Sequence, residues 1–377
     1  MTEPDKGSRA GGLLRLVALV TGVAIIAVVA VYLAKGDGDS ASGGCAGSVT
    51  EVRGIIGSEK EQYFRDPRVV ERLRCLGLRV VIDSRGSLDM VDPLRRPGNG
   101  YGFAFPGSRV TARKIMADQA VQHELPALDQ YEVFSSPMVV ATLTETVGVL
   151  RDHGSARTVD GQTVVDLAAV VEMARAGTTW NSIKDNPTAA DQTQVLLNST
   201  DPDASNSGFL LLAAAAWSAN GNRAQIGSAA LPEVANRVCQ VFAAQGGSKP
   251  VKSQDLFDQY AGQNPKTRMA YVYESQVLSA KVLPEGHAVM YPNPGIASVH
   301  TVIALTADGQ RVGQSLREDD ELAGLIAEHG FRPQGRPARA GAADPAVTAA
   351  ESPSFDEMSA LTDLLVAKRN SGKRCDQ

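Results

Sequence analysis

One uncharged apolar run near the N-terminus constrains this chain more than any other feature. The run Leu16–Ala34 (LVALVTGVAIIAVVAVYLA) has no charged residue among its 19 positions. At about 1.5 Å per helical residue, this length nearly matches a hydrocarbon core of about 30 Å. Lys6, Arg9 and Arg15 precede the run, and positive flanks stay in the cytoplasm. The sequence therefore predicts a transmembrane signal anchor over 16–34, with the N-terminus inside the cell and the remainder outside.

Other interpretations of this run remain open. A cleaved signal peptide has a shorter apolar stretch and a small-residue cleavage site. A lipoprotein signal has an aliphatic residue three positions before its cysteine, whereas Cys45 follows Ser-Gly-Gly. A buried core helix rarely sits behind a basic leader. We therefore expect cytoplasmic residues 1–15, a single-pass anchor in the cell membrane, and a flexible Gly/Ser/Asp linker over 35–48.

Composition and motifs narrow the function of the extracellular part. The chain has 37 Lys and Arg against 42 Asp and Glu, a net charge of −5, and no basic run. Nucleic acid is therefore not an expected partner. The sequence has no nucleophile elbow, zinc-protease motif or phosphate-binding loop, and its five histidines stand singly. We expect no enzyme activity, no cofactor and no metal site.

Strand and helix signals alternate after the linker. Val49–Ile56 ends apolar, as a strand does, and Leu78–Ile82 is a continuously apolar strand. Between them, Asp66 and Pro67 have the residue types of an N-cap and first helical position, and Gly77 is a typical helix end. This strand–helix–strand spacing predicts an α/β fold with parallel strands. In such folds, ligands bind where strands lead into helices.

Four strand-to-helix loops carry side chains suited to a ligand. Gly57–Lys60 offers a hydroxyl and close backbone approach, and the next loop offers an arginine that can reach a carboxylate or phosphate. Ser199–Gly208 concentrates hydroxyl and amide groups before an apolar helix, and Tyr273–Gln276 follows an apolar strand. The candidate ligand-binding residues are Ser58, Glu59, Arg85, Ser87, Thr200, Ser205, Asn206 and Tyr273. Plain helix caps, a surface arginine and a buried tyrosine are the alternative interpretations.

Taken in order, these loops resemble those of the type II extracellular solute-binding proteins. The resemblance rests on the segments G-S-E-K, R-G-S, T-D-P-D-A-S-N-S-G and Y-E-S-Q, and on the closing stretch from Y-P-N-P to E-H-G-F-R. It covers Val49–Pro333. It implies a two-lobed α/β fold, with residues 49–135 and 273–333 in lobe one and residues 136–272 in lobe two.

The resemblance also implies a way of working. Crossovers near Ser135–Pro137 and Tyr273–Glu274 would act as a hinge, and the lobes would close on a ligand held in the cleft. The implied cleft contacts are Ser58, Ser87, Ser205, Asn206 and Tyr273. The chain would then capture a small polar or anionic ligand for an ABC-type transporter permease or for another envelope protein.

Two features depart from the usual pattern of that family. One is the uncleaved anchor, and the other is the extra tail over 334–377, which we interpret as a linker followed by a helix over 355–367. They leave a second function open. In that alternative, the chain is an envelope adaptor whose cleft is filled by its own side chains and binds no small molecule.

An exported chain with four scattered cysteines is expected to form disulfides. Cys45 and Cys75 both fall in lobe one, and Cys239 can reach Cys375 if the tail folds back over lobe two. We expect these two pairs, although four cysteines allow three pairings.

Overall fold

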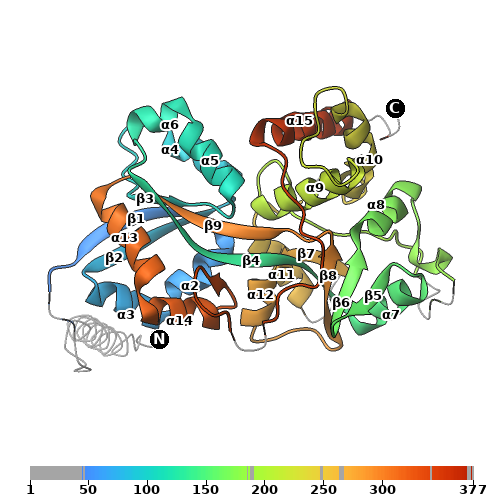
Figure 1. Cartoon of the computed structure of the whole chain (residues 1–377), viewed down its shortest axis with the longest axis horizontal. Coiled ribbons are helices and arrows are strands. Elements are labelled where there is room, and N and C mark those ends of the chain that lie inside the picture. Colours follow the sequence, from blue (N-terminus) through green and yellow to red (C-terminus); the bar gives the residue numbers. More distant parts are fainter. Residues whose placement is uncertain are drawn as a thin grey trace, which may run out of the picture. The chain divides into compact units, whose positions relative to one another are not determined.

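The computed structural model describes residues 45, 47–184, 186, 191–246, 249–262, 267–339, 342–371 and 375. The predicted anchor at 16–34 and the predicted cytoplasmic residues 1–15 lie outside these ranges. Among the described residues, no helix is both long enough and apolar enough to cross a bilayer. The described residues from Gly47 onward belong to one compact unit (Figure 1).

The strand–helix–strand unit predicted at the start of this region is present. Strand β1 (Thr50–Gly57) pairs in parallel with β2 (Leu78–Arg85). Between them, α3 (Pro67–Cys75) begins at Asp66, whose side chain accepts a hydrogen bond from the Arg68 backbone N–H at 2.8 Å. Gly77 then turns the chain with a φ of +74°, which favours glycine. Local signals alone therefore determine this unit.

Lobe one is built around the strand order β2-β1-β3-β9-β4. Its remaining strands are β3 (Phe103–Phe105), β9 (Ala297–Ala304) and the short β10 (Arg332–Pro333). Its other helices are η1 (Ser58–Lys60), α2 (Glu61–Arg65), η2 (Leu88–Met90), α4 (Val91–Leu94), α5 (Arg109–Ala117), α6 (Gln119–Glu124), α13 (Ala307–Glu318) and α14 (Asp320–Glu328). Helices lie on both faces of the strands (Figure 1), so β3 and most of β9 are buried, whereas the outermost strand β2 is partly exposed.

A single long strand, β4 (Asp129–Leu143), runs through both lobes. Its first half pairs with β9 in lobe one, and its second half, from Met138, pairs with β7 (Met269–Tyr273) and β8 (His287–Asn293) in lobe two. The first predicted crossover, near Ser135–Pro137, thus falls within a continuous strand.

Lobe two contains the second half of β4 and four further strands. Besides β7 and β8, these are β5 (Ala156–Val159) and β6 (Gln162–Asp166), and β6 runs parallel to β8. Its helices are α7 (Thr144–Asp152), α8 (Leu167–Ala176), η3 (Trp180–Ser182), α9 (Asn206–Ala219), α10 (Leu231–Ala243) and α11 (Ser253–Ala261). Helix α12 (Glu274–Ser279) follows β7 and packs on β4.

The second crossover differs from the expectation. We expected the chain to return to lobe one at Tyr273–Glu274, but β8 still pairs with lobe-two strands. The return occurs at Pro294–Ile296, between β8 and β9. The physical reason is that β4 is long enough to extend into lobe two. There β7 hydrogen-bonds to one edge of β4 and β8 hydrogen-bonds to the other edge. Residues 287–293 therefore belong with lobe two.

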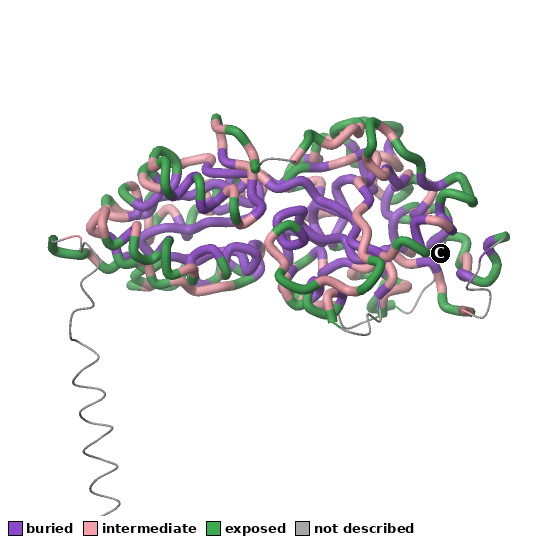
Figure 2. Tube along the Cα trace, turned by 90° about the horizontal axis from the view of Figure 1, so that it is seen from below, coloured by how far each residue is buried: buried purple, intermediate pink, exposed green. Residues whose placement is uncertain are grey.

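Each lobe has its own apolar core, which the strands cross (Figure 2). The lobe-two core includes nearly all of α9, whose alanine-rich sequence lets β7, α8 and α10 pack closely around it. Leu88 and Val110 of lobe one also pack against this core. The two lobes therefore touch through apolar as well as polar groups.

The tail after β10 is more ordered than a linker. Residues near Ala349 form a bridge with Gly295, and α15 (Phe355–Ser371) is longer than the helix expected over 355–367. Cys239 and Cys375 form a disulfide, which is the pairing expected for a tail folded over lobe two. Cys45 and Cys75 are each disulfide-bonded as well.

Candidate functional site

Three of the four predicted loops lie at strand ends, whereas the loop Ser199–Gly208 follows only an isolated bridge at Asn198 and leads into α9. Seven of the eight predicted residues are buried. Ser58 and Glu59 follow β1 in η1, Ser87 follows β2, and Tyr273 ends β7. The buried residues are Ser58, Glu59, Ser87, Thr200, Ser205, Asn206 and Tyr273. Arg85 is the exception: it is exposed and pairs with Asp83 on its own strand at 3.1 Å. The structure does not bring Arg85 to the other residues, because its side chain turns to Asp83 and solvent, whereas Ser87, two residues further on, is buried.

Side chains from both lobes meet in a buried hydrogen-bonded group that we call the interlobe layer: Ser87, Gly107, Asn206, Tyr273 and Ser298. The Asn206 amide donates to the Tyr273 hydroxyl at 2.9 Å and to the Ser298 hydroxyl at 3.3 Å. Ser298 donates to the Gly107 carbonyl, and the Gly107 N–H donates to Ser87 at 2.9 Å. An unbroken chain of hydrogen bonds thus joins lobe one to lobe two.

Two glycines allow the lobes to approach this closely. A methyl group on Gly107 would lie 2.8 Å from the Asn206 amide nitrogen, and one on Gly86 would clash with the Ala204 carbonyl oxygen. Ala204 belongs to the loop before α9, so Gly86 marks a point where the backbones of the two lobes nearly touch. Thr200 and Ser205 act within lobe two. Thr200 bonds Ser207 and the Gly208 N–H, which places the start of α9.

Beside the layer lies a buried charge cluster of Glu59, Lys60 and His300. Lys60, on η1, is fully buried and pairs with the Glu59 carboxylate, and its ammonium is 3.1 Å from His300 Nδ1. The ammonium also lies 4.9 Å from the centre of the Phe105 ring. The rings of Tyr273 and His300 are 5.7 Å apart, so the cluster adjoins the interlobe layer.

The cluster controls the protonation of its members. Burial alone would raise the pKa of the Glu59 carboxyl, but the Lys60 ammonium and the His300 hydrogen bond lower it to about 2. Burial, together with repulsion from Lys60, lowers the pKa of His300 to about 4. His300 is therefore neutral at pH 7, and its Nδ1 lies 3.1 Å from the Lys60 ammonium and 3.4 Å from the Glu59 carboxylate. Its Nε2 is buried without a hydrogen-bond partner in the described structure.

Acid is expected to destabilise the protein below pH 6.5. The unfolded chain protonates His300 near its usual pKa of 6.5, while the folded state holds that pKa at about 4. The unfolded state therefore binds more protons in this window, and stability falls by roughly 3 kcal/mol from this group between pH 7 and pH 4. Urea unfolding of the full chain at both pH values measures the loss.

The variant His300→Asn keeps a polar group near Lys60 but does not titrate, so it should lose this part of the pH dependence. His123→Asn, on the exposed side of α6, serves as the matched control. An equal pH dependence in the wild type and His300→Asn would contradict the assignment.

The sequence did not single out Lys60, Gly107, Ser298 or His300. In the sequence, Lys60 is only the end of a candidate loop and His300 is an isolated histidine, because the two residues are distant in the sequence. Gly107 lies in the short loop between β3 and α5, so the strand-to-helix rule that found the other loops could have found it.

The interlobe layer offers hydroxyl and amide groups, and the carboxylate and imidazole of the charge cluster are engaged with the Lys60 ammonium. Within the described part of the chain, the one group with metal-ligand spacing contains Cys75, whose sulfur is held in a disulfide. A groove of about 750 Å³ also lies between the lobes. Its lining includes Gln62 and Asp66 of lobe one and Gln254 and Phe257 of α11.

The fold resembles those of known binding proteins. The chain matches a periplasmic thiamin-binding protein with a TM-score of 0.55 at 10% identity, covering 90% of this chain and 100% of that one. It matches the periplasmic binding protein P5PA with a TM-score of 0.51 at 10% identity, covering 84% and 98%. Iron-bound HitA from Pseudomonas aeruginosa gives a TM-score of 0.50 at 12% identity, covering 86% and 99%. No protein-family model and no curated protein matches the sequence.

The comparisons therefore define the class of fold. The chain has the two-lobed α/β fold of the periplasmic and extracellular solute-binding proteins, as the resemblance in its sequence implied. At these identities the likeness concerns the fold alone.

Proposed function

We propose that this protein is a membrane-anchored extracellular solute-binding protein. It captures a small polar or anionic ligand between its lobes and serves a transporter permease or another envelope protein. The observation that carries the proposal is the interlobe layer, in which polar groups from loops of both lobes meet in a fully buried position. Residues 16–34 would hold the protein at the cell membrane.

The chemistry of the layer suits reversible opening. Its hydrogen bonds are mostly between neutral groups, and each has a net value of about 0.5–1.5 kcal/mol. A ligand with several oxygen atoms can replace the Asn206–Tyr273 and Asn206–Ser298 bonds at little net cost. Ligand contacts with both lobes would then shift the equilibrium between open and closed forms. The groove between α2 and α11 is lined by Gln62, two residues from Lys60 along the chain.

A ligand of the right class is expected to raise the melting temperature of the full chain in detergent. A concentration 100 times the Kd stabilises the folded state by about 2.7 kcal/mol, which corresponds to a rise of a few degrees. The screen should include phosphate, sulfate, carboxylates, sugars, thiamin and iron, the last two because the similar structures are a thiamin-binding protein and an iron-bound protein. Titration calorimetry then gives the affinity.

Asn206→Ala should abolish the rise in melting temperature caused by the identified ligand. The substitution removes the amide that hydrogen-bonds to the Tyr273 and Ser298 hydroxyls in the layer. Asn236→Ala, on the exposed face of α10, is the matched control and should keep the rise. If none of these ligands changes the melting temperature of the wild type, the solute-binding function fails.

A second candidate is the envelope adaptor, and one observation favours it. In the structure the polar groups of the layer bond one another directly, which is the self-filled cleft that an adaptor requires. Crosslinking in membranes and purification of the full chain should then recover one specific envelope protein. Recovery of that partner from Asn206→Ala as well as from the wild type, with no ligand-induced shift, would favour the adaptor.

A further inference from the structure

The described residues after β10 do not belong to the interlobe layer or the charge cluster, yet they contact both lobes. We call residues 342–371 together with Cys375 the C-terminal strap. At its start, the Arg332 guanidinium of β10 donates to the Ala343 carbonyl at 2.9 Å and pairs with Asp344 at 2.8 Å. The same guanidinium binds the buried Glu274 carboxylate through two hydrogen bonds of 2.9 Å. The beginning of the strap is thus tied to the point where α12 meets lobe one.

The middle of the strap covers the return crossover. The Gly295 N–H donates to the Thr348 carbonyl at 2.9 Å, and the Ala350 N–H donates to the Gly295 carbonyl at 2.7 Å. On the lobe-two side, the Gln162 side chain bonds the backbone of Asp344 and Ala346, both at 2.9 Å. Gly295 lies between β8 and β9, so these bonds fix the strap to the segment that must bend if the lobes separate.

Helix α15 begins at a contact between the lobes. The Phe355 ring stacks on Phe209 of α9, with ring centres 6.2 Å apart and an interplanar angle of 16°. The Lys114 ammonium of α5, in lobe one, lies 4.0 Å from the centre of the same ring. Figure 1 shows the start of α15 facing α5. Phe355 therefore links a lobe-one helix to the helix that carries Asn206.

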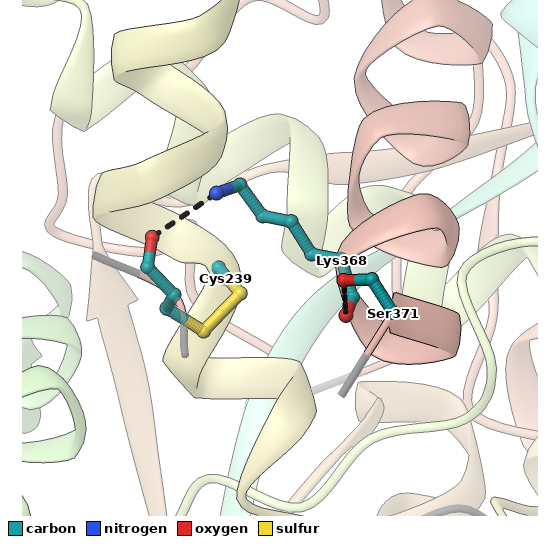
Figure 3. The surroundings of a disulfide bond; sticks show 4 residues. Cys239, Lys368 and Ser371 are labelled. Carbon is teal, nitrogen blue, oxygen red and sulfur yellow. Dashed lines mark hydrogen bonds between the residues drawn. A yellow bond between two sulfur atoms is a disulfide. The ribbon is translucent and has the colours of Figure 1, made fainter. Parts of the chain in front are cut away.

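The rest of α15 is held firmly on lobe two. Met358, Leu361 and Leu365 are buried in the lobe-two core, and α15 packs along α10. Its end is fixed by the disulfide between Cys239 and Cys375, and Lys368 donates to the Cys375 carbonyl at 3.3 Å (Figure 3).

The strap also reaches the loop before α9. The Arg369 guanidinium lies 3.5 Å from the Asp201 carboxylate. The Asp201 carbonyl accepts the Ala204 and Ser205 N–H groups in the turn that leads into Asn206. Through this ion pair, the strap stabilises the turn that positions Asn206, the lobe-two residue at the centre of the interlobe layer.

We infer that the C-terminal strap is a latch that holds the two lobes in contact and restricts opening of the interlobe layer. For the lobes to separate, Phe355 must leave either Lys114 or Phe209. The buried face of α15 and the disulfide keep Phe355 on Phe209, so the Lys114 contact is the one that breaks. Loss of the disulfide frees the end of α15 and weakens the latch. The inference rests on the proposed function only in that both require the lobes to separate.

The test measures the distance between lobes without any ligand. Dyes are placed through non-canonical amino acids at Gln119 in α6 and Asn236 in α10, both exposed, in the full chain in detergent. Single-molecule energy transfer then gives the open and closed populations. Lys114→Met, which keeps the apolar stem and removes the charge, should raise the ratio of open to closed molecules about two- to fivefold, the range expected for one cation–π contact. Lys184→Met, an exposed lysine away from the strap, is the matched control.

The double variant Cys239→Ser and Cys375→Ser should also raise the open population, as should treatment of the wild type with dithiothreitol. The melting temperature of each variant shows that it is folded. Distance distributions in Lys114→Met and the disulfide-free protein identical to that of Lys184→Met would overturn the latch. The two proposals can fail separately. If these variants have a larger open population but the screen finds no ligand, the latch is supported and only the proposed ligand binding is contradicted.

Discussion

Replacing Glu59 with glutamine is expected to lower the free energy of unfolding by about 3–5 kcal/mol, because it leaves the Lys60 ammonium buried without its counterion. Lys60 is fully buried, and Glu59 is the only carboxylate paired with it among the described residues. Its remaining polar neighbour, His300, is neutral at pH 7 and cannot compensate a full charge. Urea unfolding of the full chain at pH 7 measures the change.

Two further variants make this prediction specific. In the double variant Glu59→Gln and Lys60→Met, neither charge remains, so most of the lost stability should return. Glu71→Gln removes a carboxylate on the exposed face of α3, where it pairs with Arg74, and should leave the unfolding curve unchanged. If Glu59→Gln behaves like Glu71→Gln, the charge cluster is not buried in solution as it is in the structure.

Replacing Gly86 with alanine is expected to force the lobes apart at the interlobe layer. The added methyl group would clash with the Ala204 carbonyl and lie 3.1 Å from the Val251 carbonyl, and both are backbone atoms of lobe two. Overpacking of this kind costs about 1–3 kcal/mol. Since the cost falls on the closed form alone, the ratio of open to closed molecules should rise by about 5- to 150-fold, measured with the same pair of dyes. The affinity for any cleft ligand should fall by a similar factor.

Gly148→Ala is the matched control for this substitution. Gly148 lies in α7, and a methyl group there would meet no atom within 4 Å. Alanine is also the better helix former, so this variant should be as stable as the wild type or slightly more stable. A closed population in Gly86→Ala equal to that in Gly148→Ala would show that the lobes do not meet at Gly86.

Much of the local structure could be predicted because its signals lie within a few residues. Asp66, Pro67 and Gly77 mark the ends of α3, and the apolar residues on either side form β1 and β2 in parallel, as expected. The same applies to the apolar helix expected after the polar loop Ser199–Gly208, because α9 begins at Asn206, near the end of that loop. The rule that ligand loops follow strands selected candidate residues, and the fold places most of them in one region.

The remainder depends on pairing between distant segments. Lys60 and His300 are 240 residues apart in the sequence, so no local pattern marks one as the partner of the other. Ser298 sits within a strand and has no loop signal at all. Arg85 fits the local pattern of a ligand residue, yet its side chain turns to Asp83 and solvent.

The contacts of the C-terminal tail could not be predicted from its sequence either. Its Pro-, Ala- and Gly-rich composition indicates a linker, but the backbone of Thr348 and Ala350 hydrogen-bonds with Gly295. Backbone groups bond in the same way whatever their side chains, so composition does not reveal such a contact.

The sequence alone therefore determined the alternation of strands and helices, the order of the polar loops and the resemblance to two-lobed solute-binding proteins, because each depends on neighbouring residues. Only the tertiary structure decided which groups of the two lobes meet, that Lys60 is buried beside His300, and that the tail spans both lobes. These features arise when burial brings distant segments together, and their energy comes from partners that the local sequence does not contain.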